Sequence, residues 1–358
     1  MKTMKQPILD VRSPNLKNGA GCRAEVTITP SVAPRIDLPA QCGKRWGVIL
    51  AGGDGVRLRP LTRFISGDER PKQFCPLFGQ RTLFEQTLRR SEQIIPRDQI
   101  IVSLTGQHAK WHEQESALRP SQCIVQPANK GTAPAILHSL LSLSRLDEQA
   151  LVAILPSDHY FSDESAFASA LDCAFEVAAE MTDSVILLGA RPDYPEIEYG
   201  WIELGSPLER HRCDLFRVLS FREKPTADVA RALLLKPSVW NTFVMVGHIK
   251  AFLEMVDAAL PDLRDALSSA RTWAGTETYV EYSVYHHIHS VCFSHKVLSV
   301  HPAKLAVVRL NDVVWSDLGD PARAANVACA SGVELPWIRK WKPRELTHSV
   351  SDAATAVA

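Results

Sequence analysis

The chain has 358 residues, of which 46% are apolar and 22% charged, and its 40 basic and 40 acidic side chains give a formal net charge of zero. This length accommodates one large α/β domain or two small ones, and the composition excludes a wholly disordered chain. The balanced charge gives no support to non-specific binding of nucleic acid or of an acidic membrane. No apolar stretch approaches the ~20 residues that span a bilayer, so we expect neither a nucleic-acid nor a membrane partner.

The N-terminal segment and the cysteines indicate the cell compartment. Prolines and charged residues interrupt the first 14 residues, where a secretory signal needs an unbroken apolar core. The eight cysteines are scattered singly, without a C-x-x-C pair. Such usage is typical of free thiols in a reducing compartment and offers no zinc-ribbon spacing. We therefore expect a cytoplasmic protein whose cysteines are all reduced.

Short apolar runs alternate with helical patterns from residue 46 onward. Residues 1–45 carry five prolines and no sustained period, and we expect an irregular extension with one short strand at 25–29. Strands are then expected at 46–50, 100–103, 123–125, 151–155 and 185–189, and helices at 82–95, 105–117, 132–145 and 165–181. This alternation predicts βαβ units in a Rossmann-like, doubly wound and mainly parallel sheet of the α/β class.

From residue 200 the pattern becomes richer in strands. We expect strands at 200–204, 216–221, 243–247, 297–300, 306–310 and 313–315, and helices at 226–235, 248–259 and 279–289. We interpret this region as a strand-rich insertion within one domain over residues 46–330, followed by a C-terminal tail over 331–358. In doubly wound sheets the ligand lies beyond the carboxyl ends of the strands, where the strand order reverses.

A glycine-rich loop follows the first predicted strand. It begins at Leu50, and Gly52, Gly53 and Gly55 allow the backbone to approach a ligand closely and its N–H groups to form an anion nest. A dinucleotide fingerprint would need a third glycine where Leu58 stands, which disfavours a Rossmann dehydrogenase. A P-loop is excluded because no Gly-Lys-Ser/Thr follows.

Two cations accompany this loop. Arg57 comes directly after the glycines, and Lys72 stands in the segment Arg70-Pro-Lys-Gln-Phe74. An arginine can fork to two phosphate oxygens, and a lysine supplies a point charge. The combination of strand, glycines and cations favours phosphate binding over a glycine-rich surface turn.

The loop and the segments that follow resemble the sugar-phosphate nucleotidyltransferases, and residues 71–74 resemble most the mannose-1-phosphate guanylyltransferase branch. The further matching segments are Gln126-Pro-Ala-Asn-Lys-Gly-Thr-Ala-Pro-Ala135, Leu155-Pro-Ser-Asp-His159, Pro195-Glu-Ile-Glu-Tyr-Gly-Trp-Ile202, Phe221-Arg-Glu-Lys-Pro225, Trp240-Asn241 and Trp315-Ser-Asp-Leu-Gly319. The resemblance covers residues 46–325. It implies transfer of a nucleotidyl group from an NTP, with GTP expected, to a sugar 1-phosphate, with mannose 1-phosphate expected, and release of pyrophosphate. Because the match ends near the end of the chain, we expect a single activity.

The resemblance also implies roles for individual residues. Arg57, Lys72 and Asp158 would be catalytic, and Asp158 and Asp317, which each follow an apolar strand, would bind Mg²⁺. The nucleotide would contact Leu50, Gly52, Gly53, Gly55, Gln126 and Thr132. The sugar 1-phosphate would contact Glu196, Gly200, Glu223, Lys224 and Asn241, with Lys224 on its phosphate. The competing interpretation of the two aspartates is that each caps a helix.

The chain departs from the branch at several of these positions. Gln126 stands where Glu is common, Gly131 where Asn is common, and Thr242-Phe243 where Ser-Gly is usual. The alternatives are therefore another NTP, another hexose or heptose 1-phosphate, or a non-catalytic regulatory protein that binds a nucleotide sugar. A Ser157-Asp158-His159 triad is rejected because adjacent residues cannot form the relay. The sequence leaves open whether the protein is a homo-oligomer.

Overall fold

The computed structural model describes residues 44–341, apart from 116–118, 209–211, 270, 275–276 and 281. The strand expected at 25–29, nearly all of the N-terminal extension and residues 342–358 lie outside the described residues. No described helix combines the length and the apolar character needed to cross a membrane.

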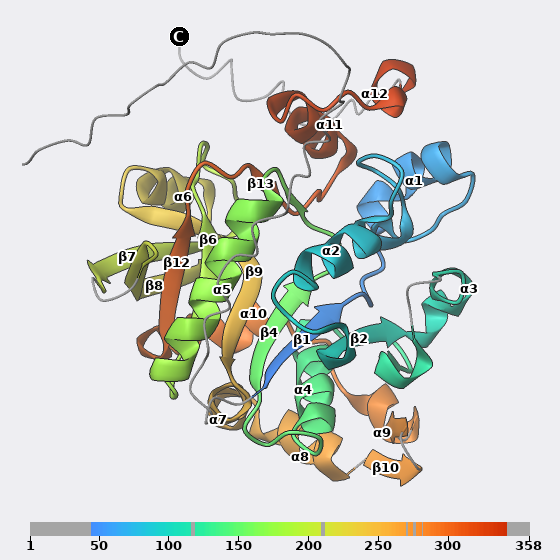
Figure 1. Cartoon of the computed structure of the whole chain (residues 1–358), viewed down its shortest axis with the longest axis vertical. Helices are drawn as coiled ribbons and strands as arrows, with labels where there is room; N and C mark the ends of the chain where they lie inside the picture. The colour runs from blue at the N-terminus through green and yellow to red at the C-terminus, as the bar shows by residue number, and fades with distance from the viewer. Residues whose placement is uncertain are drawn as a thin grey trace, which may run out of the picture. The chain divides into compact units, whose positions relative to one another are not determined.

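A mixed sheet forms the centre of the described chain (Figure 1), with nine strands in the order β3-β2-β1-β4-β9-β6-β12-β8-β7. Its strands are β1 (Arg45–Leu50), β2 (Ile100–Thr105), β3 (Cys123–Gln126), β4 (Leu151–Pro156), β6 (Val185–Ala190), β7 (Gly200–Pro207), β8 (Leu215–Glu223), β9 (Ser238–His248) and β12 (Leu305–Leu310). The first four strands pair in parallel. Strands β2, β4 and β6 are buried along their whole length, as continuous apolar runs predict.

The strands beyond residue 200 extend this same sheet. The long strand β9 runs antiparallel between β4 and β6, and its first residues also pair with β7. Strands β7 and β8 form an antiparallel edge that joins β12. The α/β class is confirmed, and the strand-rich region is continuous with the parallel strands.

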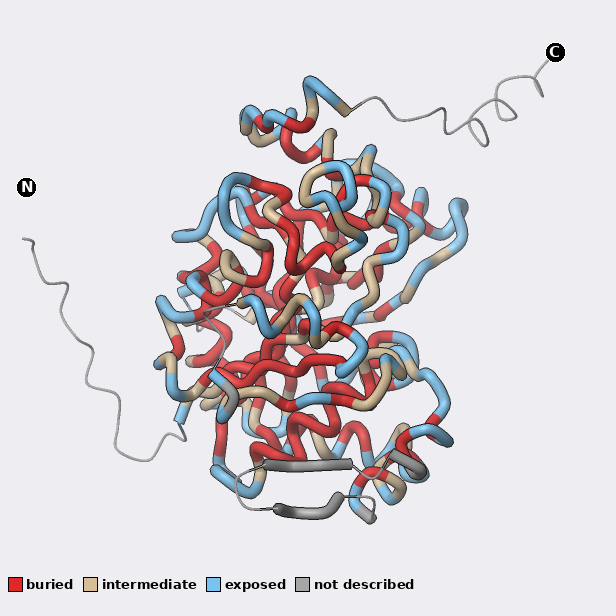
Figure 2. The backbone as a smooth tube through the Cα atoms, turned by 90° about the vertical axis from the view of Figure 1, so that its right-hand side faces the viewer, coloured by how far each residue is buried: buried red, intermediate tan, exposed pale blue. Residues whose placement is uncertain are grey.

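Helices cover both faces of the sheet. They are α1 (Arg59–Ser66), α2 (Leu83–Ser91), α3 (Ala109–His112), α4 (Thr132–Leu143), α5 (Glu164–Glu180), α6 (Ala227–Leu234), α7 (Ile249–Ala259), α8 (Pro261–Ser269), α9 (Tyr282–His287), α10 (Phe293–Lys296), α11 (Pro321–Ala330) and α12 (Pro336–Lys340). One apolar core joins the sheet to α4, α7, α8 and α10. A second core joins the other face to α2, α5 and α6. Figure 2 shows the buried backbone concentrated in the interior of the domain.

A third apolar cluster lies outside the sheet. It joins α1, α11 and α12. The indole of Trp337 donates to the carbonyl of Leu77 at 2.8 Å, and Trp341 packs edge-on against Phe64. Two short two-stranded sheets complete the fold, β5 (Tyr160–Phe161) with β13 (Trp315–Ser316), and β10 (Arg271–Ala274) with β11 (Glu277–Val280).

Most predicted helices are present near their predicted bounds. Helix α2 begins with a capping box, in which Thr82 Oγ1 accepts from the Glu85 amide at 3.1 Å and Glu85 Oε2 accepts from the Thr82 amide at 3.0 Å. Three predictions are wrong. The described part of 105–117 contains only the short α3 after a 3₁₀ turn. Residues 279–280, where we expected the helix at 279–289 to begin, belong to strand β11, and the helix α9 is confined to Tyr282–His287. Residues 298–300 form a 3₁₀ turn, because the Val297 amide continues the turn of α10 by donating to the Phe293 carbonyl.

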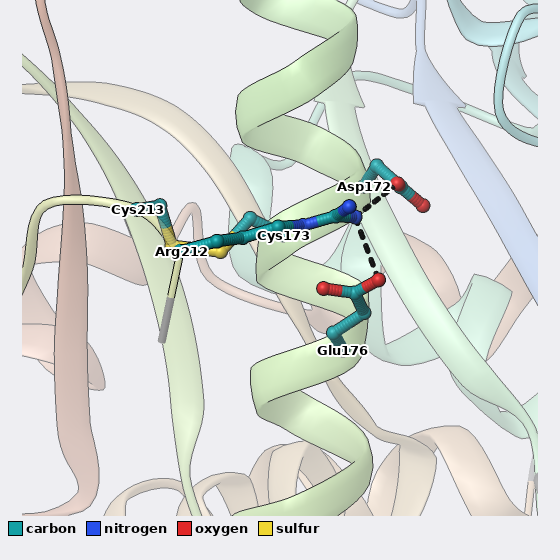
Figure 3. Close-up of a disulfide and its surroundings, with 5 residues drawn as sticks. All are labelled: Asp172, Cys173, Glu176, Arg212 and Cys213. Atoms are coloured by element: carbon teal, nitrogen blue, oxygen red, sulfur yellow. Dashed lines mark hydrogen bonds and ion pairs between the residues drawn. A yellow bond between two sulfur atoms is a disulfide. The ribbon is translucent and has the colours of Figure 1, made fainter. Parts of the chain in front are cut away.

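The expectation of free cysteines is wrong for one pair. Cys173 on α5 and Cys213, just before β8, form a disulfide (Figure 3). Beside it the guanidinium of Arg212 donates to the carboxylates of Asp172 and Glu176, both at 2.6 Å. The partners lie 40 residues apart in sequence, a separation at which spacing alone does not show that two cysteines meet. The free cysteines of the described chain are Cys75, Cys123, Cys292 and Cys329.

Candidate functional site

A cavity of about 410 Å³ opens where several strands of the sheet end. It brings together most of the residues predicted from the sequence, namely Leu50, Gly52, Gly53, Arg57, Gln126, Thr132, Asp158, Gly200, Glu223, Lys224, Asn241 and Asp317. Leu50, Gln126 and Glu223 are each the last residue of their strand. For Leu50 and Gln126 the convergence follows from the topology, because parallel strands present their carboxyl ends at one edge. Glu223 ends the antiparallel strand β8 and pairs with Gly200 at the start of β7, which also lines the cavity.

Three predicted residues do not line this cavity: Gly55, Lys72 and Glu196. Gly55 has a φ of 55°, and a Cβ there would lie 3.0 Å from the Lys72 amide nitrogen. Both observations require glycine. Gly55 therefore contributes to the site by letting the glycine loop pass close to the turn that carries Lys72.

Lys72 lies beneath the cavity, between the two predicted metal ligands. Its ammonium is 3.3 Å from Asp158 Oδ2 and donates to the carbonyl of Asp317. The residue is 8% exposed. The neighbouring Gln73 amide donates to the carbonyls of Ala51 and Gly53, both at 2.9 Å. The short turn after Pro71 thus fastens the glycine loop and aims the lysine at both aspartates.

Asp317 is held by several donors. Its Oδ1 accepts from Arg323 at 2.7 Å, from the Tyr199 hydroxyl at 3.2 Å and from the Gly319 amide at 2.9 Å. Burial raises the pKa of this carboxyl, but the positive charges of Lys72 and Arg323 outweigh burial and hold its pKa below the ordinary value. Asp317 is therefore ionised at neutral pH.

Neither aspartate caps a helix. The N-cap of α11 is Asp320, whose side chain accepts from the Arg323 amide, and Asp158 precedes the short strand β5. The competing interpretation of the two aspartates as helix caps is thereby wrong.

Arg323, on the first turn of α11, is a residue that the sequence analysis missed. Its guanidinium also donates to Glu196 Oε2 at 2.8 Å and lies 4.8 Å from the centre of the Tyr199 ring. Glu196, which we expected to contact the sugar, thus holds Arg323, and Arg323 holds Asp317. The sequence does not reveal that Arg323 joins Glu196 to Asp317, because Arg323 and Glu196 are 127 residues apart.

Glu198 is the second missed residue, and it lies between two predicted phosphate ligands. Its Oε2 is 3.3 Å from Arg57 Nη1 and 3.5 Å from Lys224 Nζ. The side chains of Arg57 and Lys224 are 56% and 54% exposed, so both cations face solvent in the cavity. A carboxylate here occupies the position where an anionic ligand would meet both cations.

The side of the cavity near Lys224 is closely packed around Gly200. A Cβ on Gly200 would lie 2.8 Å from Glu223 Oε2 and 3.2 Å from Asn241 Cβ, so a larger residue there would force the Glu223 carboxylate to move. Burial raises the pKa of Glu223, and the charge of Lys224 opposes that shift. Phe243 has a φ of 63°. Its backbone amide donates a hydrogen bond to Asn241 Oδ1 at 3.1 Å, which stabilises this conformation. A left-handed backbone is thus kept at the position where the branch usually has glycine.

The opposite side of the cavity is built from hydroxyl and amide groups. The Gln126 side chain donates from Nε2 to Ser103 Oγ at 3.0 Å and accepts at Oε1 from the Tyr285 hydroxyl. Thr132 Oγ1 accepts from the Phe293 amide at 2.8 Å. Tyr285 was missed, since its helix lies 159 residues from Gln126 in sequence.

A further contact joins the glycine loop to the segment before α4. Asp54 Oδ2 accepts from Asn129 at 2.8 Å, and its Oδ1 lies 3.1 Å from His108 Nε2. Burial lowers the pKa of His108 despite the neighbouring Asp54 carboxylate. Asp54 therefore connects the two loops on this side of the cavity.

The donor set around Lys72 fits a magnesium ion. Mg²⁺ is commonly bound through one or two carboxylates and completed by water and substrate phosphates. The described residues contain no cluster of three or more histidine, cysteine or acidic side chains at metal-binding geometry. Asp158 and Asp317, both close to the Lys72 ammonium, match the two-carboxylate arrangement.

Comparison with known proteins agrees with this geometry. The chain is 31% identical over 240 residues to the xanthan biosynthesis protein XanB of Xanthomonas campestris pv. campestris (strain B100), covering 66% of this chain and 48% of that protein. It is 29% identical over 278 residues to a mannose-1-phosphate guanylyltransferase of Klebsiella pneumoniae, covering 76% of this chain and 57% of that protein. The chain thus spans about half the length of the curated relatives it matches.

A solved structure and a family model extend this comparison. The crystal structure of a mannose-1-phosphate geranyltransferase from Thermus thermophilus aligns with a TM-score of 0.67 and 29% identity over 79% of each chain. The family model for nucleotidyl transferases matches residues 46–330, which include every residue of the cavity. The chain therefore belongs to the nucleotidyl transferase family.

Proposed function

We propose that the protein transfers a nucleotidyl group from an NTP to a sugar 1-phosphate and releases pyrophosphate, with GTP and mannose 1-phosphate as the expected substrates and Mg²⁺ as the cofactor. The observation that carries this proposal is the position of Lys72 between Asp158 and Asp317, beside a cavity that also holds Arg57 and Lys224. Relatives named mannose-1-phosphate guanylyltransferase support the choice of substrates.

The reaction needs charge stabilisation more than a protein nucleophile. A phosphate oxygen of the sugar 1-phosphate attacks the α-phosphorus of the NTP, a new P–O bond forms, and the bond to pyrophosphate breaks. The attacking oxygen is already anionic, so no serine or cysteine is required. Catalysis of such transfers depends on positioning and on electrostatic stabilisation.

Each cation of the cavity has a place in this scheme. Arg57 would bind the outer phosphates of the NTP and stabilise the departing pyrophosphate. Lys72 would contact the reacting phosphates from beneath, and Lys224 would hold the phosphate of the sugar. Asp158 and Asp317 would hold Mg²⁺, which supplies positive charge to the phosphates when it is bound.

Glu198 adds a step to substrate binding. Its carboxylate contacts Arg57 and Lys224, so incoming phosphates must displace it from both cations. Because exposed ion pairs are weak, this displacement costs little free energy. The Glu198 carboxylate also offsets the repulsion between the like charges of Arg57 and Lys224.

Different parts of the sheet would bind the nucleotide and the sugar. The order β3-β2-β1-β4 with helices on both faces supports a Rossmann-like, doubly wound half that presents the nucleotide. Gly200, Glu223 and Asn241 come from the antiparallel strands β7, β8 and β9, which would serve as the sugar-binding insertion.

A grid of NTPs and sugar 1-phosphates with Mg²⁺ tests the proposal through pyrophosphate release. We expect release with GTP and mannose 1-phosphate. Release with another pair would keep the reaction and change the substrates. Absence of release with every pair, together with measurable binding of a nucleotide sugar, would instead support a non-catalytic regulatory protein, an alternative that the altered Gln126, Gly131 and Thr242-Phe243 positions favour.

A further inference from the structure

The described lining of the cavity around Gln126 contains no charged side chain, unlike the side around Arg57. It includes Gly52, Ser103, Gln126, Thr132 and Ala135. Such a surface suits an uncharged planar group rather than a phosphate. Under the proposed function, on which this inference rests, that group is the nucleobase of the NTP.

The carboxamide of Gln126 is the central polar group on this side, and two hydroxyls use part of its hydrogen-bonding capacity. The residue is 2% exposed. A carboxamide offers two N–H donors and two acceptor lone pairs. One N–H of Gln126 donates to Ser103 Oγ, and one lone pair of Gln126 Oε1 accepts from the Tyr285 hydroxyl. One N–H and one lone pair therefore stay available for a base edge.

The glycine loop leaves this carboxamide close to the ligand space. A Cβ on Gly52 would lie 3.6 Å from Gln126 Nε2 and 2.6 Å from Thr105 Oγ1. A Cβ at position 52 would therefore clash with Thr105, and a longer side chain would extend over the amide with which the Cβ is already in contact. The glycine keeps the approach to Gln126 open.

Tyr285 determines which way the carboxamide faces. The tyrosine is fully buried, burial raises its pKa, and it keeps its proton at neutral pH. Among the described residues its hydroxyl has Gln126 Oε1 as its hydrogen-bond acceptor. If the carboxamide turned by 180°, Nε2 would face the phenol, and the buried O–H would lose its acceptor. Both hydroxyls can donate or accept, but a phenol is a stronger donor and a weaker acceptor than an aliphatic hydroxyl, because its oxygen lone pair is delocalised into the ring. Tyr285 therefore favours Oε1 as its partner, whereas Ser103 accommodates either atom of the carboxamide.

We propose that Tyr285 is a specificity-determining positioning residue, which fixes the Gln126 carboxamide so that the site selects bases with a carbonyl oxygen beside a ring N–H. Guanine, hypoxanthine, uracil and thymine present this order of acceptor and donor. Adenine and cytosine present an amino donor beside a ring nitrogen acceptor, which is the reverse order. A freely turning carboxamide pairs with either order, whereas a fixed one pairs with one.

Inosine triphosphate and ATP provide a matched pair of probes. The two purines have the same shape and differ in the 6-oxo group with N1–H against the 6-amino group with a bare N1. Calorimetry in the presence of Mg²⁺ would measure the dissociation constant of each nucleotide from the unaltered full chain and from Tyr285→Phe. The phenylalanine keeps the packing of the ring and removes the hydroxyl. UTP and CTP repeat the comparison for pyrimidines.

The matched control is Tyr160→Phe, a buried tyrosine outside the lining of the cavity. We expect the unaltered protein and this control to bind inosine triphosphate in preference to ATP. In Tyr285→Phe the dissociation constant for ATP divided by that for inosine triphosphate should fall about tenfold. If Tyr285→Phe does not fold, Gln126→Leu removes the carboxamide itself and should make the two dissociation constants equal.

Equal binding of inosine triphosphate and ATP by the unaltered protein would overturn the inference, and so would an unchanged ratio in folded Tyr285→Phe. The outcome is separable from that of the proposed function because binding is measured without turnover. A Tyr285-dependent ratio without pyrophosphate release would support the inference and contradict the transferase proposal. Pyrophosphate release with an unchanged ratio would do the reverse.

Discussion

The two sides of the cavity hold their polar groups by different means. Around Lys72 and Arg57, positive and negative side chains neutralise one another, as Lys72 does with Asp158 and Arg57 does with Glu198. Around Gln126, two hydroxyls direct one neutral carboxamide. Coulombic attraction acts over several ångströms and depends weakly on angle, whereas a hydrogen bond depends on direction. The charged side is therefore suited to hold phosphates, and the uncharged side to distinguish one base edge from another.

The largest effect is expected from Asp158→Asn, which removes one carboxylate charge from the charged side. The amide keeps the shape of the side chain but is a poorer ligand for Mg²⁺ and a weaker partner for Lys72. We expect kcat for pyrophosphate release to fall by at least about 100-fold, with an unchanged thermal unfolding midpoint.

Asp214→Asn is the control for this change, since Asp214 forms an ion pair with Arg309 away from the cavity. Its turnover should match that of the unaltered protein. Unchanged turnover in Asp158→Asn would remove Asp158 from the proposed metal site.

The next effect is expected from Arg323→Lys. A lysine keeps the charge but cannot fork to Glu196 and Asp317 as the guanidinium does. Because partners that orient a metal ligand affect metal affinity, the Mg²⁺ concentration for half-maximal activity should rise about 10-fold to 100-fold. The rise should exceed any change in KM for the NTP.

The equivalent change at Arg212, which also bridges two carboxylates but lies beside the disulfide, serves as the control. An unchanged Mg²⁺ requirement in Arg323→Lys would show that Asp317 needs no bridge to be placed.

These residues also show where sequence reasoning stops. The glycine loop, the strand ends and the two aspartates were predictable, because glycine-rich turns and apolar strands are recognised from residues that are neighbours in sequence. The sheet topology then brings the ends of the strands together. Arg323, Glu198 and Tyr285 act through partners 127, 141 and 159 residues away. Their identity as arginine, glutamate and tyrosine carries no local pattern, so the fold alone shows what they contact.

The same limit explains the errors outside the site. The disulfide partners Cys173 and Cys213 meet because α5 packs near the start of β8, and their spacing gives no indication of it. Residues 298–300 have the apolar composition of a strand, yet Leu298 is buried within a 3₁₀ turn. A short apolar run specifies burial and leaves the backbone conformation to its neighbours.

A third prediction separates the two ends of the charged side. Lys224→Ala removes the cation proposed for the sugar phosphate and leaves Arg57 in place. We expect KM for the sugar 1-phosphate to rise about tenfold, as for the loss of one charged hydrogen bond, with a smaller change in KM for the NTP.

Lys236→Ala, which removes a similarly exposed lysine paired with Glu203, should leave both KM values unchanged. A larger change for the NTP than for the sugar 1-phosphate in Lys224→Ala would mean that the roles of the cations are exchanged.

The smallest effect is expected from Glu198→Gln, and its sign is opposite to that of the others. The carboxylate competes with phosphates for Arg57 and Lys224, so its neutralisation should lower KM for at least one substrate. The pairs are half exposed and weak, which limits the change to roughly two-fold to five-fold. Glu203→Gln, which neutralises a carboxylate paired with Lys236, should not change either KM. A rise in KM for Glu198→Gln would mean that the carboxylate orients the two cations for phosphate, and that the charged side, like the carboxamide of Gln126, depends on direction as well as on charge.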